Sequence, residues 1–243
     1  MGYSWLTIHR VNYSNARSYA DDGALPGPTA AKAWRYGPHA PLGKGPARTG
    51  IANEWGFVGF YENRSDAEQV LAEPERNLPF LSDTAEHWHA LAAVISHRGK
   101  VDWSTKDEPH PEPKPLEADP GGVLAVVTSA GYDKIDESQF ARIRNFQEKV
   151  DHVIDYFGTL DANIARSLFT ATEARQGMTF SVWRSDATMA TSAYRSGVHA
   201  EYIQQHKKES LFDYSSFTRL RLLDSCGSWD GIDPREAALS EAS

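Results

Sequence analysis

The chain has 243 residues, of which 40% are hydrophobic and 24% are charged, a composition that allows one large core or two small ones. Its net charge of −8 argues against a nucleic-acid surface, because phosphate contacts need clustered Lys and Arg. The single cysteine, Cys226, excludes an internal disulfide and a cysteine-rich zinc site. No apolar stretch is long enough to span a bilayer and no signal-peptide pattern opens the chain, so we expect a cytoplasmic protein without a stable membrane anchor.

Strands and helices alternate in the first part of the chain. Runs rich in aromatic and β-branched residues predict strands, and a polar turn followed by helix-forming residues predicts a helix. The strands are expected at 3–11, 33–36, 55–61 and 88–97, a weak helix at 15–20, and a second helix at 65–73. This is the βαββαβ order of a ferredoxin-like unit.

A proline-rich, acidic segment follows at 104–120. It contains five prolines and almost no apolar residues, so we expect no packed element there. The segment is therefore predicted to be a linker between an N-terminal half at 1–103 and a C-terminal half at 121–231. The tail at 232–243 is expected to be loose.

The C-terminal half repeats the same order of elements. Apolar residues at helical spacing predict a long helix that begins near 136. Two more helices are expected at 185–194 and 199–210, and strands at 122–128, 164–172, 178–183 and 217–223. We therefore predict an α+β fold in which two ferredoxin-like βαββαβ halves pack as an α+β barrel, with the helices outside.

A short motif supports this duplication. Arg-Ser-Asp-Ala occurs at 64–67 and again at 184–187, each time after an expected strand and before an expected helix, with Ser or Asp placed to cap the helix. Gly99 and Gly227 close the two halves in similar surroundings. The chain therefore looks like a duplicated domain, in which one copy alone can carry a site.

The last long helix carries the main candidate residues. His199, Tyr202, Ile203 and His206 fall on one face of it, together with residues that point to the core. Spacing alone favours a buried histidine that is hydrogen-bonded to a backbone carbonyl. The alternative is a neutral imidazole that binds a metal, which a single histidine can do for a haem because the porphyrin supplies four other ligands.

Other candidate ligands are weaker. His87 and His89 lie on one face of an expected strand, a spacing compatible with a metal, but no third ligand is evident and a solvated pair is favoured. Cys226 could serve as a thiolate ligand, whereas a small buried thiol is its usual role.

The turn between two strands of the second half carries three polar candidates. Two interpretations of Glu173, Arg175 and Gln176 are equally favoured. They belong to a surface hairpin, or they lie at the mouth of a barrel, where they could orient a polar substrate or a haem propionate. The chain contains no phosphate-binding loop, no dinucleotide fingerprint and no common hydrolase motif. Nucleotide cofactors and ordinary hydrolysis are therefore poorly supported.

Three stretches resemble the C-terminal half of the spheroidene monooxygenase family. They are RQGMTFSVWRSDA at 175–187, AYRSGVHAEYI at 193–203 and Leu-Phe at 211–212 before the last strand. The family shows a similar RQ-x-TFS-[IL]-W stretch, a helix with aromatic residues, a Gly-x-His and a closing strand that ends in G-x-W-x-G. The match covers about 121–231, and it is looser in the first half.

The resemblance implies a cofactor and a fold. Members of this family are haem-dependent oxygenases of acyclic carotenoids, and their fold is related to duplicated ferredoxin-like haem proteins such as chlorite dismutases and aldoxime dehydratases. It thereby implies a haem b whose iron is bound by His199, with Tyr202 and Ile203 beside it. Because an interfacial helix with a basic face is absent from the sequence, we expect a water-accessible substrate instead of a membrane-dissolved polyene.

The function expected from these observations is that of a haem-dependent, monooxygenase-like oxidoreductase acting on a small or medium organic metabolite. Glu173, Arg175 and Gln176 would then be candidates for the catalytic rim of the pocket. Two alternatives stay open: a haem-dependent dehydratase or nitrogen-oxidising enzyme of secondary metabolism, and a non-catalytic barrel, for example a homodimer, that binds haem or a small ligand. The sequence identifies neither the substrate nor the electron donor.

Overall fold

The computed structural model describes residues 2–18, 27–38, 51–100, 111–171, 176–195 and 197–240. Eight strands of these residues form one antiparallel sheet. The first four are β2 (Trp5–Ser18), β3 (Ala33–Pro38), β4 (Ile51–Tyr61) and β5 (Thr84–Gly99). The other four are β7 (Val123–Gly131), β8 (Asn163–Ala171), β9 (Gln176–Trp183) and β10 (Tyr214–Gly227).

The order of the strands is the same in both halves. Across the sheet it is β3-β4-β2-β5-β10-β7-β9-β8, so the first strand of each half lies between the third and the fourth. The two halves meet where β5 pairs with β10. The predicted α+β class is confirmed, as is the sequence of four strands in each half. Whether each half is a separate domain stays a prediction.

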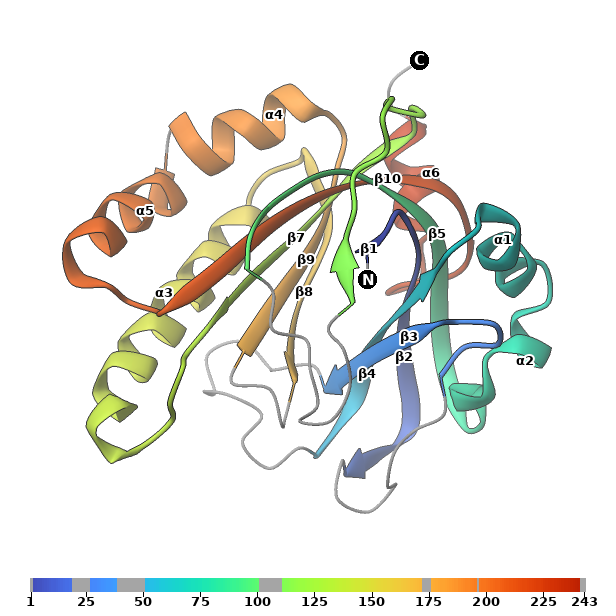
Figure 1. Cartoon of the computed structure of the whole chain (residues 1–243), viewed down its shortest axis with the longest axis horizontal. Coiled ribbons are helices and arrows are strands. Elements are labelled where there is room, and N and C mark those ends of the chain that lie inside the picture. The colour runs from blue at the N-terminus through green and yellow to red at the C-terminus, as the bar shows by residue number, and fades with distance from the viewer. Residues whose placement is uncertain are drawn as a thin grey trace.

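Helices accompany both sets of strands. In the first half they are α1 (Arg64–Ala72), α2 (Pro74–Asn77) and the 3-10 turn η1 (Pro79–Leu81). In the second half they are η2 (Glu137–Gln139), α3 (Phe140–Gly158), α4 (Asp186–Ala190), the π-helix η3 (Thr191–Arg195), α5 (Gly197–Glu209) and α6 (Pro234–Leu239). In Figure 1, α3, α4 and α5 lie together beside the C-terminal strands, and α1 and α2 lie beside the N-terminal strands.

The weak helix expected at 15–20 is wrong for its first part, because residues 15–18 continue β2; residues 19 and 20 lie outside the described residues. Pairing with β4 at Arg17 and Ser18 holds this end of the strand in the sheet.

No helix in the described part of the chain is both long and apolar enough to cross a membrane.

The two copies of the repeated motif lie at equivalent junctions. Each follows the third strand of its half and begins a helix, α1 or α4. In the second copy Ser185 caps the helix and its hydroxyl accepts a hydrogen bond from the N–H of Thr188. In the first copy the cap is Asn63 instead of a residue of the motif, and it makes no side-chain cap bond. The motif therefore marks the position of the helix more reliably than its capping residue.

The ladder between β5 and β10 has matching ends. The N–H of Lys100 donates to the carbonyl oxygen of Ser215 over 3.0 Å, and the N–H of Ser228 donates to the carbonyl oxygen of His87 over 2.8 Å. Each bond joins the residue after a closing glycine, Gly99 or Gly227, to the start of the other half's last strand. This symmetry supports the duplication predicted from the sequence.

Alternating residues of the strands separate two faces of the sheet. On β2, Leu6 and Ile8 belong to the largest apolar core, whereas Val11 and Tyr13 pack with α1 and η1 in a second core. No ladder joins the edge strands β3 and β8 among the described residues. Closure of the sheet into a barrel therefore stays a prediction.

Part of the expected linker is paired. A short strand β6 (Glu112–Pro113) lies parallel to β1 (Gly2–Tyr3). The N–H of Lys114 donates to the carbonyl of Tyr3 over 2.8 Å, and the N–H of Leu116 donates to that of Val94 over 2.9 Å. The expectation of no packed element is wrong for this stretch, because alternate backbone groups of a proline-rich segment still bond to a neighbouring strand.

The tail is also ordered, contrary to the sequence-based expectation. Helix α6 buries Pro234 and Ala238, and Nε1 of Trp88 donates to Oδ1 of Asp233 over 3.1 Å. The guanidinium of Arg184 donates to the carbonyl oxygen of Ala237 over 2.9 Å. The prediction of a loose tail is therefore wrong for residues 232–240, and 241–243 lie outside the described residues.

Candidate functional site

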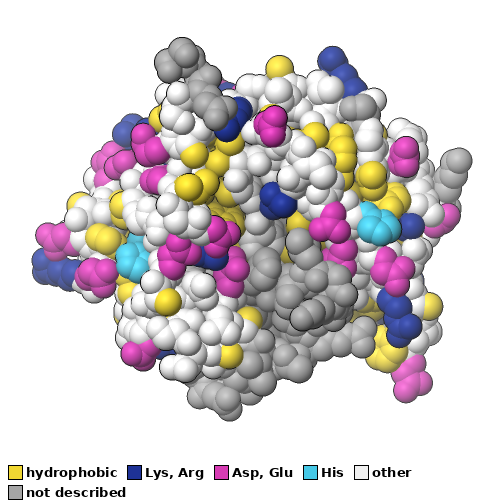
Figure 2. Space-filling view, turned by 180° about the vertical axis from the view of Figure 1, so that it is seen from behind, with side chains coloured by type: hydrophobic (Ala, Val, Ile, Leu, Met, Phe, Trp, Pro, Cys, Tyr) yellow, Lys and Arg dark blue, Asp and Glu magenta, His cyan; other side chains and the backbone are white. Residues whose placement is uncertain are grey.

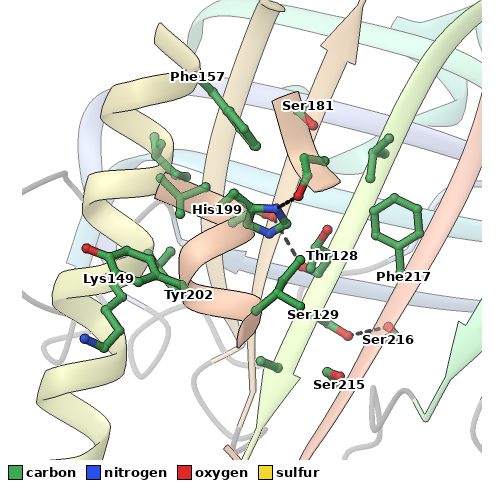
Figure 3. Close-up of a pocket in the computed structure, with 18 of the residues that line it drawn as sticks. Thr128, Ser129, Lys149, Phe157, Ser181, His199, Tyr202, Ser215, Ser216 and Phe217 are labelled. Carbon is green, nitrogen blue, oxygen red and sulfur yellow. Dashed lines mark hydrogen bonds between the residues drawn. The ribbon is translucent and has the colours of Figure 1, made fainter. Parts of the chain in front are cut away.

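A cavity of about 380 Å³ lies between the helices and the strands of the C-terminal half, a volume within the range of small-molecule sites. Most of its wall is apolar, and α3 contributes Phe146, Val150, Val153 and Phe157 to it. The strands contribute hydroxyl groups, among them Thr128 and Ser181, which Figure 3 shows opposite the helices. The cavity is therefore suited to a mainly apolar ligand with a few polar groups.

The corresponding face of the first half is filled. There Phe80 of η1 stacks on Phe57 of β4 with the ring centroids 3.9 Å apart, and Tyr13 and Trp55 are fully buried beside them. Four aromatic side chains thus occupy the space between helices and strands. In the C-terminal half, the equivalent space between helices and strands contains the cavity.

His199 is positioned by an irregularity in the helix before it. The π-helix η3 precedes α5, and the carbonyl oxygen of Ala193 in η3 lies 2.6 Å from Nδ1 of His199. Because a carbonyl only accepts hydrogen bonds, Nδ1 carries the proton and donates it. The lone pair of the neutral ring is then on Nε2. Irregular turns of this kind often occur at functional sites.

The surroundings keep this imidazole neutral. Burial lowers the pKa of His199, and the bond to Ala193 opposes this only in part. The side chain lines the cavity (Figure 3), and Nε2 has no hydrogen-bond partner among the described residues. An uncharged nitrogen with a free lone pair therefore borders an apolar cavity, where it can bind a metal or accept a proton.

The neighbours predicted from helical spacing also line the cavity. Tyr202 contacts α3, where its hydroxyl lies 3.0 Å from Nδ1 of His152, and Ile203 adds to the apolar wall. His206 lines the cavity too, but its Nδ1 accepts a hydrogen bond from the N–H of Leu211 over 3.1 Å. The spacing therefore predicted which residues share this face, while their role toward a cofactor stays a prediction.

The three rim candidates cannot be placed as side chains. Glu173 and Arg175 lie outside the described residues, and Gln176 begins β9 with a side chain that is likewise outside the description. Their proposed roles stay predictions. Sequence reasoning missed three cations that line the cavity, Arg98, Lys149 and Arg166. They come from β5, α3 and β8, so no local spacing in the sequence links them.

The residues around the cavity fit the haem that the family resemblance implies. Metal-binding histidines usually donate their other ring N–H to a carbonyl or carboxylate, as Nδ1 of His199 does to Ala193. Apolar walls suit a porphyrin, and the cations could pair with its propionates. The donor set therefore agrees with a haem bound through Nε2 of His199.

The other two candidate histidines, His87 and His89, belong to a chain of hydrogen-bonded side chains. Nε2 of His89 lies 2.9 Å from Nδ1 of His87, and Nδ1 of His89 lies 3.0 Å from Nδ1 of His9. The chain continues from Nε2 of His9 to the hydroxyl of Thr7 over 2.7 Å and from there to Tyr61 over 3.3 Å. No group of three or more potential ligands converges on one point in the described part of the chain.

This chain of side chains is largely buried. His9 and His89 are 1% and 0% exposed, so the expectation of a solvated pair is wrong for His89. Burial and the adjacent imidazole, His87, lower the pKa of His89 to about 3, and burial together with His89 lowers the pKa of His9. Both rings are neutral, and each nitrogen of both rings has a hydrogen-bond partner.

Cys226 is not among the described residues that line the cavity. Its side chain packs against the second core, and Sγ lies 3.9 Å from the carbonyl oxygen of Leu71. Burial, with Asp224 and Asp233 nearby, raises the pKa of this thiol to about 11. A protonated, half-buried thiol agrees with the packing role favoured by the sequence.

Comparisons with known proteins give distant structural similarity. No protein-family model matches the chain, and no curated protein matches it in sequence. A candidate monooxygenase from Fusobacterium nucleatum subsp. nucleatum is 11% identical, with a TM-score of 0.40 over 96% of this chain and 97% of its own. An anthrone oxidase-like protein is 10% identical, with a TM-score of 0.32 over 95% and 96% of the two chains.

A further candidate monooxygenase, from Lactobacillus acidophilus, is 10% identical, with a TM-score of 0.33 over 93% of this chain and 100% of its own. Similarity at this level spans nearly the whole chain but establishes neither a family nor an activity. The resemblance of residues 121–231 to the spheroidene monooxygenase family therefore stays a prediction.

Proposed function

We propose that this protein is a haem-dependent, monooxygenase-like oxidoreductase that acts on a small or medium organic metabolite. One observation carries the proposal: the carbonyl of Ala193 fixes the proton of His199 on Nδ1, which leaves the lone pair of Nε2 at the wall of a mainly apolar cavity. When bound there, a haem supplies the activation of oxygen or peroxide.

The chain's own residues have three tasks in this proposal. His199 holds the iron through Nε2, and the hydrogen bond to Ala193 orients the ring and makes its free nitrogen a stronger donor. Phe157, whose ring centroid lies 5.8 Å from that of His199, helps to keep water from the cavity. Hydroxyl groups such as Thr128 offer hydrogen bonds that orient a substrate against the apolar wall.

The test begins with the absorption spectrum of the purified protein, reconstituted with haem b where needed. We expect a Soret band with about one haem per chain, and we expect His199→Ala to lose it or shift it strongly. His206→Ala is the matched control on the same helix, because its Nδ1 is already bonded to Leu211. Equal haem content and equal spectra in the wild type and His199→Ala would overturn the proposal.

The reaction class needs a second measurement. Turnover of a substrate should require oxygen or peroxide and should be lost in His199→Ala. Conversion of the substrate by the ferrous protein without either oxidant would overturn the oxygenase part of the proposal. That outcome would favour a dehydratase, while the haem site on His199 would stand.

A further inference from the structure

The wall of the cavity carries a charge opposite to that of the whole chain. The net charge is −8, and acidic side chains are spread over the face shown in Figure 2. In contrast, Arg98, Lys149 and Arg166 line the cavity, and no Asp or Glu is found among the described residues that line it. Low-dielectric walls with charge of one sign attract ligands of the opposite sign.

Among the described residues, none of these three cations is in an ion pair, although the charge of Asp155 acts on Arg166 from nearby. Nε of Arg166 donates to the carbonyl oxygen of Ile154 over 2.9 Å, and Nζ of Lys149 lies 4.8 Å from the centre of the Tyr202 ring. Arg221, in contrast, pairs with two aspartates elsewhere. Arg98 is exposed and keeps its water, but the partly buried Arg166 is costly to hold at an apolar wall, and a bound anion would offset that cost.

The cations lie at separate edges of the cavity. Arg98 is on β5 and Arg166 is on β8, with β10, β7 and β9 between them. At about 4.8 Å per strand, the path along the curved sheet from the backbone of Arg98 to that of Arg166 is about 19 Å. The two propionates of a haem leave the ring at one edge and therefore account for one of these positions. The other position is left for a second anion.

We propose that the cavity selects an organic acid as its ligand, with an apolar body against α3 and a carboxylate at Arg98 or Arg166. This deepens the proposed function, since it names the class of substrate. The same chemistry has two sources, a haem propionate and a free organic acid. Anion selection itself depends on the cavity and its cations, so it can hold even where the haem proposal fails.

The first experiment compares two fluorescent probes that share one aromatic framework. 1-Anilinonaphthalene-8-sulfonate carries a negative charge, and N-phenyl-1-naphthylamine is neutral. We expect the anionic probe to bind the folded protein at least about tenfold more tightly, and Arg98→Met and Arg166→Met each to weaken it about threefold to tenfold. Neutral-probe affinity should not change.

The control is Arg76→Met, which removes an exposed arginine of α2 and should leave both affinities unchanged. Arg98 is exposed and makes no ion pair with a described residue, so its variant should fold even where Arg166→Met does not. Equal binding of the two probes, or anionic-probe affinity unchanged by Arg98→Met and Arg166→Met, would overturn the proposal.

A second arm separates the two sources of the anion. Titration with haem b and with its dimethyl ester, followed by the Soret band, measures what the propionates contribute. We expect Arg98→Met or Arg166→Met, but not both, to weaken haem b relative to the ester, and the other variant to weaken 1-naphthoate binding to the haem-loaded protein. If haem binding is absent but the anionic probe is still preferred, the haem proposal is wrong and the proposal of an organic-acid ligand is supported. Equal effects of both variants on haem b, with none on 1-naphthoate, would overturn the second anion site.

Discussion

The ring of Tyr156 on α3 occupies the space in which a side chain at Gly197 would begin. A Cβ built on Gly197 would lie 2.6 Å from Cζ of Tyr156, and the φ of +78° places this residue in the left-handed region. Gly197 is the first residue of α5 and lies two residues before His199. Close contact with α3 therefore fixes where the helix that carries His199 begins.

Gly197→Ala should consequently disturb both stability and the site. The added methyl group meets the Tyr156 ring and the backbone conformation is unfavourable, so we expect the free energy of unfolding to fall by about 2–4 kcal/mol. Gly121→Ala is the matched control, because Gly121 has a similar φ of +75° but nothing within 4 Å of its Cβ position. It should cost about 1–2 kcal/mol. Equal losses in urea denaturation would contradict the steric explanation.

The chain of buried histidines should make the protein sensitive to acid. His9 and His89 have folded-state pKa values below the ordinary value of 6.5, with that of His89 at about 3. Below pH 6.5 the unfolded state therefore binds more protons than the folded state. Burial of both rings in the neutral form stabilises the fold fully above this pH. This stabilisation falls by about 1.4 kcal/mol per pH unit for each ring as the pH drops below 6.5, and for His89 the loss continues to about pH 3.

Urea denaturation at several pH values between 7.5 and 5 measures this slope. His89→Gln, which can still donate and accept hydrogen bonds, should reduce the slope by about one proton, whatever its effect on stability at pH 7.5. His152→Gln is the control, because His152 lies on the surface of α3. An unchanged slope in His89→Gln would show that this residue does not carry the acid sensitivity.

Glu86 should hold the loop before the C-terminal helix. Partial burial raises its pKa, but hydrogen bonds from the N–H of Gly231, from Arg10, from the N–H of Asp230 and from the hydroxyl of Ser228 outweigh this and lower it to about 2. Glu86→Ala removes the acceptor of all four and leaves buried Arg10 with fewer partners. We expect the unfolding free energy to fall by about 2–4 kcal/mol.

Glu86→Gln is the informative comparison, because it keeps an acceptor oxygen and loses the charge. It should cost less than Glu86→Ala, and limited proteolysis should cut between residues 228 and 233 faster in the Ala variant than in the Gln variant. Equal stability of Glu86→Ala and the wild type would mean that the loop is held by other contacts.

Removal of residues 232–243 should destabilise the protein. The truncation uncovers Trp229, which is 5% exposed, and takes away the Asp233 acceptor of Trp88. Because apolar burial and one buried hydrogen bond are both lost, we expect the free energy of unfolding to fall by about 3–5 kcal/mol. A second truncation, of 241–243 alone, should leave thermal and urea unfolding unchanged. If the variant without residues 232–243 is as stable as the wild type, the tail does not stabilise the fold, as the sequence predicted.

The sequence was sufficient for the strands, because their signal is local. Alternation and β-branched residues marked all eight strands of the sheet to within a few residues at most ends. Helical spacing likewise placed His199, Tyr202 and Ile203 on the face that lines the cavity. The order of the strands across the sheet, in contrast, is known from the structure alone.

Contacts between distant residues could not be predicted from the sequence. The apolar stripe of α3 predicted a packed face, yet Phe146, Val150 and Phe157 line a cavity, because packing depends on what stands opposite the stripe. Likewise, His89 bonds to His9 as well as to His87, because β2 places His9 opposite His89 on β5.

By itself, then, the sequence determined the class of fold, the duplication and the inward face of His199, all of which depend on periodicity along the chain. Only the tertiary structure decided that Ala193 orients His199, that cations from β5, α3 and β8 border the cavity, and that the tail packs as α6. Each of these depends on groups brought together by the sheet order and the helix break, and hydrogen bonds and charges act across space whatever their separation in sequence.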